Sequence, residues 1–405
     1  MKKLIVLNYQ REVPPYLISE INFAKNQYDD VYYLTPTLYN DNTETVKSDN
    51  VHIVQIEKKQ KFISLLRCFL IIFSKEFISD IMNALREKKF GKAFIKHLLT
   101  EFVCSDMLFR GAKPLLRGED ENIVLASWFS VEAYAAARLK KCFPEIRAYS
   151  FAHAFEIKPE VNKFVYLSLN KFKHCYLDGV YFISETMRNV YHEATQNRFA
   201  EYADKEHVRY LGSSKKREEL NPQSSKGFHI ISCASATKLK RLELILDSLD
   251  FADDCDITWT HLGDGPEMPG LRAEAEDLLK NKPGLKIEFP GRFTNAQVHD
   301  YYANEPVDLF VSASSSEGLP VSIMEALSYG IPVLATDAGG TREAVDDSVG
   351  KLIPVQITPE ELYNYINAFR KLSVDEITEM RKLAFERWDG RFNLAVNAME
   401  FYNEL

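Results

Sequence analysis

The sequence predicts an α/β protein made of two doubly wound domains. Its 405 residues are too many for one hydrophobic core and suit two domains of ordinary size. In each half, short apolar and β-branched runs alternate with stretches of helical periodicity, the pattern of parallel sheets covered by helices. Residues 213–227, between the halves, are polar and rich in helix breakers, so we expect a linker there.

The first half predicts a domain over residues 1–212. We expect its strands at 3–7, 31–34, 52–55, 123–126, 146–151, 179–182 and 208–211. We expect its helices at 16–25, in the long basic region up to residue 116, at 131–141 and at 162–176.

The second half repeats the alternation and predicts a domain over residues 228–386. We expect strands at 228–232, 256–263, 286–289, 309–313, 332–335 and 350–353. We expect helices at 242–249, 268–280, 295–304, 321–329, 341–344 and 359–372.

The bulk composition is that of a globular protein in a reducing compartment. Hydrophobic residues make up 46% of the chain and charged residues 27%. The six cysteines are scattered without a C-x-x-C pair, so neither a zinc site nor a disulfide framework is indicated. The longest apolar stretch, 62–73, is interrupted by Arg67 and is too short to span a bilayer. The apolar run after Met1-Lys-Lys stops at Leu7, which suits a first strand better than a signal peptide, and we expect a cytoplasmic protein.

The net charge of −8 hides an asymmetry between the halves. Residues 57–118 carry 13 Lys/Arg against 6 Asp/Glu, whereas residues 228–355 carry 10 against 21. The basic region is also rich in Phe, Leu and Ile, which suits helices that lie on an anionic membrane surface, and equally suits apolar faces packed inside the first domain. Nucleic-acid binding is disfavoured because no recognised motif accompanies the basic patch.

The most specific stretch is residues 316–325, S-E-G-L-P-V-S-I-M-E, which follows the predicted strand 309–313. Pro320 stands where a first helical residue is expected, and apolar residues then recur at helical spacing. The unpaired N–H groups at that helix start favour a phosphate. Glu317 in the turn and Glu325 in the helix suit hydrogen bonds with the hydroxyls of a sugar and of a ribose.

At these residues the chain resembles a known family. The pattern E-G-L-P-x-x-x-x-E, then A-L-x-x-G-x-P-V and D-x-G-G-x-x-E (Asp337 to Glu343), is similar to the donor-site signature of retaining glycosyltransferases of family 4, in glycosyl transferases group 1. The alternative for a lone pair of glutamates, a solvated helix face, does not account for the following glycine-rich run.

The resemblance implies the GT-B fold: two Rossmann-like domains facing each other across a cleft, with a C-terminal helix that crosses back to the first. Residues 387–405 resemble that returning helix. It implies an acceptor-binding first domain and a second domain that binds a nucleotide-sugar. It further implies that the donor diphosphate binds the helix start formed by Gly318, Leu319, Pro320 and Val321, that Glu325 holds the ribose, and that Glu317 contacts the sugar.

A second phosphate contact is expected in the loop after strand 228–232. The family has an Arg in this loop and a Lys just before the helix. Lys240 matches the Lys, and a cation there opposes the charge of the leaving diphosphate. The position of the Arg is occupied by Ser235, so that contact is missing or is supplied by Arg241 or Lys238.

Two further turns match the family in order along the chain. His261-Leu-Gly-Asp-Gly-Pro266 resembles its G-x-G-P loop, in which Gly263 and Gly265 let the backbone approach a ligand. Phe289-Pro-Gly-Arg-Phe293 resembles its F-x-G turn, which cradles the nucleobase, and Arg292 could cover the base. The identity of the base is not decided by such contacts.

In the first domain, His153 matches a histidine that lines the reacting sugar in the family, and Glu156 replaces the family's Asp. Glu317, His153 and Lys240 are therefore the predicted catalytic residues. The loop after the first strand, 8–15, has no glycine, so the acceptor side departs from the usual pattern.

No metal or other cofactor is expected. An Asp-x-Asp motif at a strand end is missing from the sequence, and the pairs Asp253-Asp254 and Asp346-Asp347 suit solvated turns. A helix start together with Lys240 can neutralise a diphosphate without Mg²⁺.

The sequence thus predicts a retaining glycosyltransferase that moves a sugar from a nucleotide-sugar to a glycan or lipid-linked acceptor, in bacterial cell-envelope polysaccharide synthesis. It is expected in the cytoplasm, with a peripheral place at the inner face of the membrane through residues 57–118. Two alternatives stay open: a sugar-nucleotide epimerase of the same fold, and a non-catalytic partner subunit, which the Ser at position 235 keeps in view. The sugar, the acceptor, the linkage and the oligomeric state are not specified by the sequence.

Overall fold

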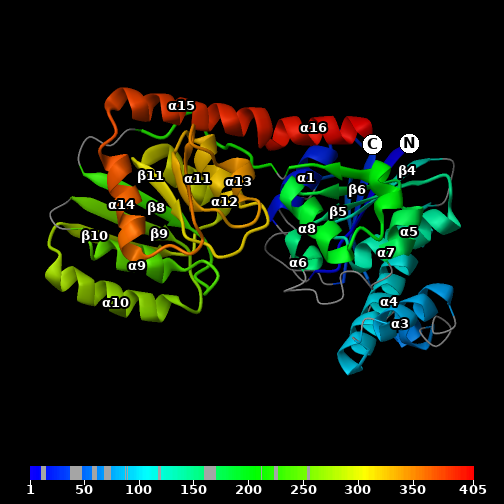
Figure 1. Cartoon of the computed structure of the whole chain (residues 1–405). Helices are drawn as coiled ribbons and strands as arrows, with labels where there is room; N and C mark the ends of the chain where they lie inside the picture. Colours follow the sequence, from blue (N-terminus) through cyan, green and yellow to red (C-terminus); the bar gives the residue numbers. More distant parts are fainter. Residues whose placement is uncertain are drawn as a thin grey trace. The chain divides into compact units, whose positions relative to one another are not determined.

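The structure is a computed structural model that describes most of the chain (Figure 1). The described residues are 1–10, 15–36, 48–56, 62–67, 74–86, 88, 90–116, 120–158, 170–210, 212–222, 227–252 and 256–405. Several sequence predictions fall on residues outside these ranges, namely part of the loop 8–15, part of the basic region 57–118, the start of the helix 162–176, part of the linker 213–227, and Asp253-Asp254.

The chain divides into two compact units. Unit 1 comprises Met1–Arg209 and Ala398–Leu405, and unit 2 comprises Tyr210–Asn397. The first segment of unit 1 ends at Arg209, three residues before the end of the predicted first domain.

Unit 1 is built on a seven-stranded parallel sheet in the order β3-β2-β1-β4-β5-β6-β7. Its inner strands are fully buried apolar runs, as in β1, where Leu4–Leu7 lie between helices on both faces. The strands are β1 (Lys2–Leu7), β2 (Asp30–Thr35), β3 (Val51–Gln55), β4 (Glu121–Ala126), β5 (Arg147–Ala152), β6 (Gly179–Phe182) and β7 (Glu206–Val208). The predicted strand 208–211 is displaced, because β7 ends at Val208.

The helices of unit 1 include one that the sequence analysis missed. α8 (Glu185–Thr195) begins at Ser184, whose hydroxyl accepts a hydrogen bond from the Met187 N–H. In Figure 1, α3 and the N-terminal part of α4 project from the body of the unit. The helices are α1 (Pro15–Ala24), α3 (Lys75–Arg86), α4 (Lys92–Ala112), α5 (Val131–Cys142), α6 (Ala154–Ile157), α7 (Asn170–Tyr176) and α8.

Unit 2 is built on a six-stranded parallel sheet in the order β10-β9-β8-β11-β12-β13. Its strands are β8 (Phe228–Cys233), β9 (Ile257–Leu262), β10 (Leu285–Gly291), β11 (Leu309–Ser312), β12 (Val333–Thr336) and β13 (Gly350–Ile353). Trp259 on β9 is fully buried in a core shared by α9 and α14. The helices are α9 (Leu242–Leu249), α10 (Met268–Asn281), α11 (Asn295–Asn304), α12 (Val321–Ser328), α13 (Thr341–Ala344), α14 (Pro359–Arg370) and α15 (Val374–Arg391).

The C-terminal region differs from the single returning helix predicted over 387–405. α15 ends at Arg391, and a separate helix, α16 (Leu394–Glu404), follows. The start of α15 is marked by a capping box in which Ser373 and Glu376 exchange hydrogen bonds. The end of α16 belongs to unit 1, where Phe401 and Tyr402 are buried and the Phe401 ring packs 5.3 Å from that of Phe151.

Each sheet has a topological switch point, where the strand order reverses. In unit 1 it lies between β1 and β4, and in unit 2 between β8 and β11. Ligands of open parallel sheets bind beyond the carboxyl ends of the strands at such points. The loops after these four strands are therefore the first places to look for a site.

Within the described residues, no helix has both the length and the apolar character needed to cross a bilayer.

Candidate functional site

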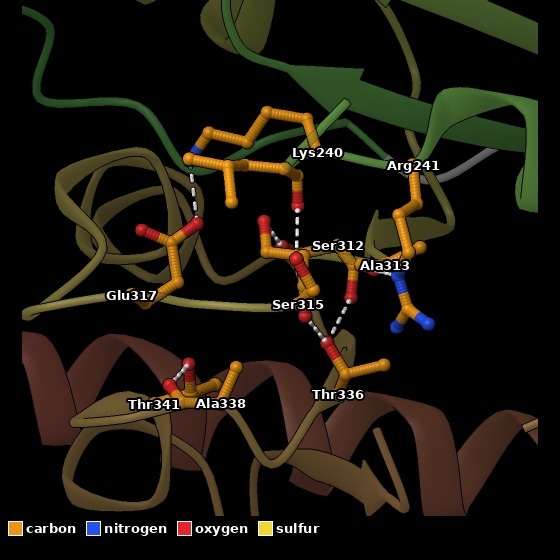
Figure 2. A network of polar contacts seen from close by, with 11 residues as sticks. Lys240, Arg241, Ser312, Ala313, Ser315, Glu317, Thr336, Ala338 and Thr341 are labelled. Atoms are coloured by element: carbon orange, nitrogen blue, oxygen red, sulfur yellow. Dashed lines mark hydrogen bonds and ion pairs between the residues drawn. The ribbon is translucent and has the colours of Figure 1, made fainter. Parts of the chain in front are cut away.

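The switch point of unit 2 brings together a lysine and a glutamate that the sequence analysis had singled out. Lys240 follows the loop after β8, and Glu317 lies in the loop after β11. The Lys240 Nζ atom lies 2.5 Å from the Glu317 Oε1 atom (Figure 2). Their side chains are 27% and 12% exposed, so the pair is reached by solvent yet partly desolvated. Such a pair offers a cation and an anion side by side to a polar ligand.

Backbone contacts hold the two loops in place. The Ser315 N–H donates to the Leu239 carbonyl oxygen at 2.8 Å, which ties the β11 loop to the residue before Lys240. Beneath it, the Thr336 hydroxyl donates to the Ser314 carbonyl oxygen (Figure 2). The loop that leads to Glu317 is therefore held at Ser314 and Ser315.

Gly339 supports Glu317 from the next loop. Its φ of +58° lies in the left-handed region, and a Cβ atom there would come within 2.0 Å of the Glu317 carbonyl oxygen. The neighbouring Gly340 N–H donates to the Gly318 carbonyl oxygen at 2.9 Å. The glycine pair of the D-x-G-G pattern thus allows two backbones to touch beneath the predicted donor site.

α12 begins directly after this loop. Pro320 is its N-cap, not its first helical residue, and it makes no side-chain cap hydrogen bond. The first N–H groups of a helix have no partner within the helix, and its dipole makes that end positive. Gly318, Leu319, Pro320 and Val321 thus form the helix start that the sequence analysis assigned to a diphosphate, and this assignment stays a prediction.

Glu325, in the second turn of α12, is a buried carboxylate. It accepts a hydrogen bond from the Asn295 side-chain amide at 2.5 Å. Burial raises the pKa of Glu325 to about 7, while the Asn295 amide and the charge of Lys216 oppose the rise. The sequence analysis did not single out Asn295, whose position at the start of a helix gave no sign of its contact with a residue thirty positions later.

Arg241 is placed differently from Lys240. Its guanidinium donates to the carbonyl oxygens of Ala313 and Val355 at 2.7 and 2.8 Å. In Figure 2 it points away from the Lys240–Glu317 pair. Arg241 therefore clamps the loops after β11 and β13, and this geometry gives little support to its predicted role as the substitute for an Arg at Ser235. Ser235 and Lys238 are both exposed on the loop after β8.

Gly263 and Gly265 have a structural reason that differs from the predicted one. A Cβ atom at these positions would lie 1.9 Å from the Ala234 carbonyl oxygen and 2.4 Å from that of Ala236, respectively. The glycines thus let the loops after β8 and β9 pass each other. The contacts described for these glycines are with the protein itself, among them a hydrogen bond from the Gly265 N–H to the Asp264 carboxylate, and a ligand contact stays a prediction.

The turn after β10 carries Arg292 and Phe293. Arg292 is exposed, and the Phe293 ring packs edge-on against Tyr301 with their centroids 6.1 Å apart. Gly291 before them has a φ of +91°, which explains the glycine of the F-x-G turn. Nothing in this geometry assigns a base to the turn.

His153 lies in unit 1, at the end of β5. Its ring is 5% exposed, packs 4.4 Å from that of Trp128, and contacts the Ser127 carbonyl oxygen through Nε2 at 3.1 Å. Burial lowers its pKa to about 4, so the imidazole is neutral at pH 7. Glu156 accepts from the backbone N–H groups of His153 and Phe129, which gives this carboxylate a local structural role. The catalytic role of His153 stays a prediction.

Sequence reasoning missed a cavity of about 380 Å³ at the switch point of unit 1. Tyr9 and Gln10 reach it from the loop after β1, and Trp128 to Ser130 from the loop after β4. Three almost fully buried charged side chains, Glu101, Glu132 and Lys173, also line it. The signal available in the sequence was the segment S-W-F-S directly after a predicted strand. We call this cavity the unit 1 pocket.

Among the described residues, no group of three or more His, Cys, Asp or Glu side chains is placed to hold a metal ion. Asp346 accepts from Ser348 and pairs with Arg387, and Asp347 pairs with Lys351, so these carboxylates have protein partners. The expectation of no metal cofactor stays a prediction.

Comparison with known proteins relates the chain to glycosyltransferases. It is 30% identical over 174 residues to the putative colanic acid biosynthesis glycosyltransferase WcaL of Escherichia coli, covering 41% of this chain and 42% of that protein. It is 30% identical over 145 residues to the putative teichuronic acid biosynthesis glycosyltransferase TuaC of Bacillus subtilis, covering 35% of this chain and 33% of that protein. The chain thus matches less than half of the length of each relative.

Solved structures match over the whole chain. A glycosyltransferase from Rickettsia africae superposes with a TM-score of 0.69 at 14% identity, covering 100% of this chain and 98% of that one. Alr3699/HepE of Anabaena, solved in complex with UDP, gives a TM-score of 0.69 at 15% identity, covering 100% and 99%. The predicted GT-B fold is confirmed, and residues 213–384, which hold the Lys240–Glu317 pair, match the family of glycosyl transferases group 1.

Proposed function

We propose that this protein is a retaining, metal-independent glycosyltransferase that moves a sugar from a nucleotide-sugar to a glycan or lipid-linked acceptor. The observation that carries the proposal is the Lys240–Glu317 pair at the unit 2 switch point, within the segment that matches glycosyl transferases group 1. The relatives named for colanic and teichuronic acid biosynthesis support a place in cell-envelope polysaccharide synthesis. Structures of the same fold that hold UDP or UDP-glucose support a nucleotide-sugar donor.

Each residue of the site has a distinct role in this proposal. The bond from the anomeric carbon to the diphosphate breaks, and negative charge develops on the leaving oxygen. The Lys240 ammonium and the N–H groups at the start of α12 stabilise that charge. Glu317 accepts hydrogen bonds from the sugar hydroxyls, and Glu325 from the ribose hydroxyls. The oxygen of an acceptor hydroxyl attacks on the face from which the diphosphate departs and gives its proton to the leaving diphosphate oxygen, so the new glycosidic bond keeps the anomeric configuration. His153 of unit 1 contacts the reacting sugar.

The position of Lys240 has a consequence for donor binding. In the structure its ammonium is shared with Glu317 alone among the ion pairs of the described residues. A diphosphate would compete for the same cation. We expect Glu317 to exchange this ion pair for sugar hydroxyls when the donor binds, so that Lys240 is held in place until a stronger anion arrives.

The test begins with donor binding. A thermal-shift screen against UDP-, GDP-, ADP- and CMP-sugars should show a rise in melting temperature with one nucleotide class, because a ligand that binds only the folded state stabilises it. Glu325→Ala should abolish the shift. No shift with any class, or an equal shift in Glu325→Ala, would contradict the proposal.

The same protein sample separates the two alternatives. Incubation of the donor without acceptor should leave the sugar-nucleotide unchanged apart from slow hydrolysis, whereas an isomerised sugar-nucleotide would indicate an epimerase. A protein that binds donor but neither hydrolyses nor transfers it would indicate a non-catalytic subunit. The locations proposed for the protein are the cytoplasm and the inner face of the membrane.

A further inference from the structure

Next to the unit 1 pocket lies a second cavity of about 740 Å³, which we call the α4 groove. Its wall is mainly one stripe of α4, where lining residues recur at helical spacing from Lys92 through Leu99 to Val103. The stripe is about 17 Å long at a rise of about 1.5 Å per residue. Leu65 and Phe90, which are 51% and 47% exposed, stand at its sides.

The groove is apolar along its length and basic at one end. Ile95, Leu99 and Val103 supply the apolar wall, while Lys92 and Lys96 are exposed one helical turn apart. The first turn of α4 contains no acidic residue that would offset these charges. An elongated hydrocarbon wall with two ammonium groups matches an amphiphile that carries a phosphate, since lysine binds phosphate as a point charge.

The groove and the unit 1 pocket meet at Tyr9, which lines both. α4 also serves both cavities, because Glu101 faces the pocket and Thr100 the groove. The pocket has the chemistry of a sugar site. Buried Glu101, Glu132 and Lys173 can exchange hydrogen bonds with hydroxyls, and the rings of Trp128 and Phe155 can cover the apolar face of a sugar.

We propose that the α4 groove binds the hydrocarbon chain of a phosphate-bearing lipid, so that the acceptor is a lipid-linked glycan whose sugar enters the unit 1 pocket. This inference rests on the proposed function only in calling the bound lipid an acceptor; binding of the lipid by the groove does not depend on it. The chain would lie against Ile95, Leu99 and Val103, and its phosphate would contact Lys92 and Lys96. The α4 groove thus selects the lipid-linked acceptor from the two acceptor classes that the sequence left open.

A second exposed apolar surface provides a matched control. Ile78, Met82 and Leu85 are exposed on α3 at spacings of four and three residues, and none of them lines the groove. If residues 57–118 adsorb on a bilayer, the exposed α3 residues should be needed for lipid binding. If the region binds the hydrocarbon chain of one lipid molecule, the groove should be needed and the α3 residues should not.

The experiment measures the affinity of octyl phosphate, below its critical micelle concentration, by titration calorimetry of the full chain without donor. We expect octyl phosphate to bind at least ten-fold more tightly than inorganic phosphate or 1-octanol. Thr100→Trp, at an exposed position where the larger side chain fills the groove, should weaken it at least ten-fold. Lys96→Gln should lower the affinity for octyl phosphate several-fold and leave the affinity for 1-octanol unchanged. Met82→Gln should bind as the parent protein does.

Three results would overturn the inference: no preference for octyl phosphate over inorganic phosphate, equal affinity in Thr100→Trp, or binding that requires vesicles of anionic phospholipid and is lost in Met82→Gln. The last result would assign the region to adsorption on a bilayer. Nucleotide-sugar thermal shifts recorded on the same variants keep the two proposals apart. A parent protein that shows donor shifts but no preference for octyl phosphate overturns the groove alone, whereas a parent protein that binds octyl phosphate but shows no donor shift overturns the transferase.

Discussion

In unit 2 the loops after β8 and β11 meet through a lysine and a glutamate that solvent reaches, whereas in unit 1 the loops after β1 and β4 meet through a glutamate that solvent hardly reaches. Lys240 and Glu317 are 27% and 12% exposed, and Glu132 is 2% exposed. The Glu132 carboxylate accepts from the Tyr9 N–H and from the Ser130 hydroxyl, so it joins the two loops of its switch point much as the Lys240–Glu317 pair joins those of unit 2.

The difference indicates which kind of ligand suits each switch point. A partly exposed ion pair beside a helix start presents charge, which suits an anion such as a diphosphate. Buried carboxylates among aromatic rings present hydrogen-bond acceptors in a small volume, which suits a neutral polyhydroxyl compound. Burial raises the pKa of Glu132, and it raises the pKa of Glu156 to about 8, so the Glu156 carboxyl group is largely uncharged near neutral pH. We therefore expect two sheets with similar strand orders to serve two kinds of ligand.

The largest expected effect comes from removing the cation of unit 2. Lys240→Met should lower the rate of sugar transfer by about 10²–10³-fold, because stabilisation of the leaving diphosphate by a positioned charge is worth about 3–4 kcal/mol. Steady-state kinetics with the donor identified by thermal shift would measure it. Lys351→Met, which removes an exposed lysine paired with Asp347 in the same unit, serves as control and should change the rate less than two-fold. A rate within a few-fold of the parent in Lys240→Met would remove the main distinction between the two switch points.

The next effect tests the support of the Glu317 loop. Gly339→Ala places a Cβ atom 2.0 Å from the Glu317 carbonyl oxygen in a backbone with positive φ, so the loop must shift. We expect donor affinity to fall at least ten-fold and the free energy of unfolding to fall by about 1–3 kcal/mol. Chemical denaturation and donor titration would measure both. Gly270→Ala in α10, where a Cβ atom meets nothing within 4 Å, should instead stabilise the protein by about 0.5–1 kcal/mol. An unchanged donor affinity in Gly339→Ala would show that the Glu317 loop is not part of the site.

A third prediction concerns Glu325, the buried carboxylate of unit 2. Its pKa is about 4.5 in the unfolded chain and about 7 in the folded one, so the folded state binds the extra proton. Stability should therefore fall as pH rises from 4.5 to 7, by up to about 3 kcal/mol, and stay low above pH 7. Glu325→Gln removes this loss and should be the more stable protein at pH 8, while it binds donor more weakly.

Denaturation curves and donor titrations of Glu325→Gln at pH 5 and pH 8 would test whether the variant gains stability at pH 8 while its donor affinity falls. In the parent protein, donor affinity should rise between pH 6 and 8, because the ionised carboxylate is the better acceptor for ribose hydroxyls. A variant that is less stable than the parent at pH 8 would contradict the assigned pKa. One that keeps full donor affinity would contradict the role of Glu325.

The sequence predicted most of unit 2 because its signals are local. The predicted bounds of α9 and α11 agree with the structure, and Glu317 and Glu325 stand where the strand–turn–helix pattern put them, while Pro320 lies one position before the first helical residue. The contacts that the sequence could not predict join distant residues. The clamp made by Arg241 needs the carbonyl of Val355, and the reason for Gly263 is the Ala234 carbonyl in another loop.

The pocket and the groove of unit 1 were not predicted, for the same reason. The pocket is assembled from α4, α5 and α7 and from three strand ends, and the segment S-W-F-S marks only one of these parts in the sequence. His153 was chosen by resemblance, yet the described residues that line the pocket include its neighbours Trp128 and Glu156 and not His153 itself. The apolar and basic character of the α4 region was visible in the sequence, but the groove it forms with Tyr9 was not.

The smallest expected effect tests whether Glu156 of unit 1 is a structural counterpart to Glu325. Both carboxylates are buried, and burial raises the pKa of Glu156 to about 8. At pH 7 most of its carboxyl groups are therefore protonated in the folded state, a form that Gln resembles in shape and hydrogen bonding. The glutamine carbonyl can accept from the His153 and Phe129 N–H groups as Glu156 does now.

We expect Glu156→Gln to change the free energy of unfolding by less than about 1 kcal/mol at pH 6. Because the parent alone loses stability as pH rises from 4.5 to 8, the variant should become the more stable of the two at pH 9. Donor affinity should be unaffected, in contrast to Glu325→Gln. Thermal denaturation at the two pH values and a donor titration would measure all three quantities.

A variant that is strongly destabilised at pH 6 would mean that Glu156 is ionised there, and the unit 1 pocket would then be anionic and unsuited to the neutral sugar inferred above.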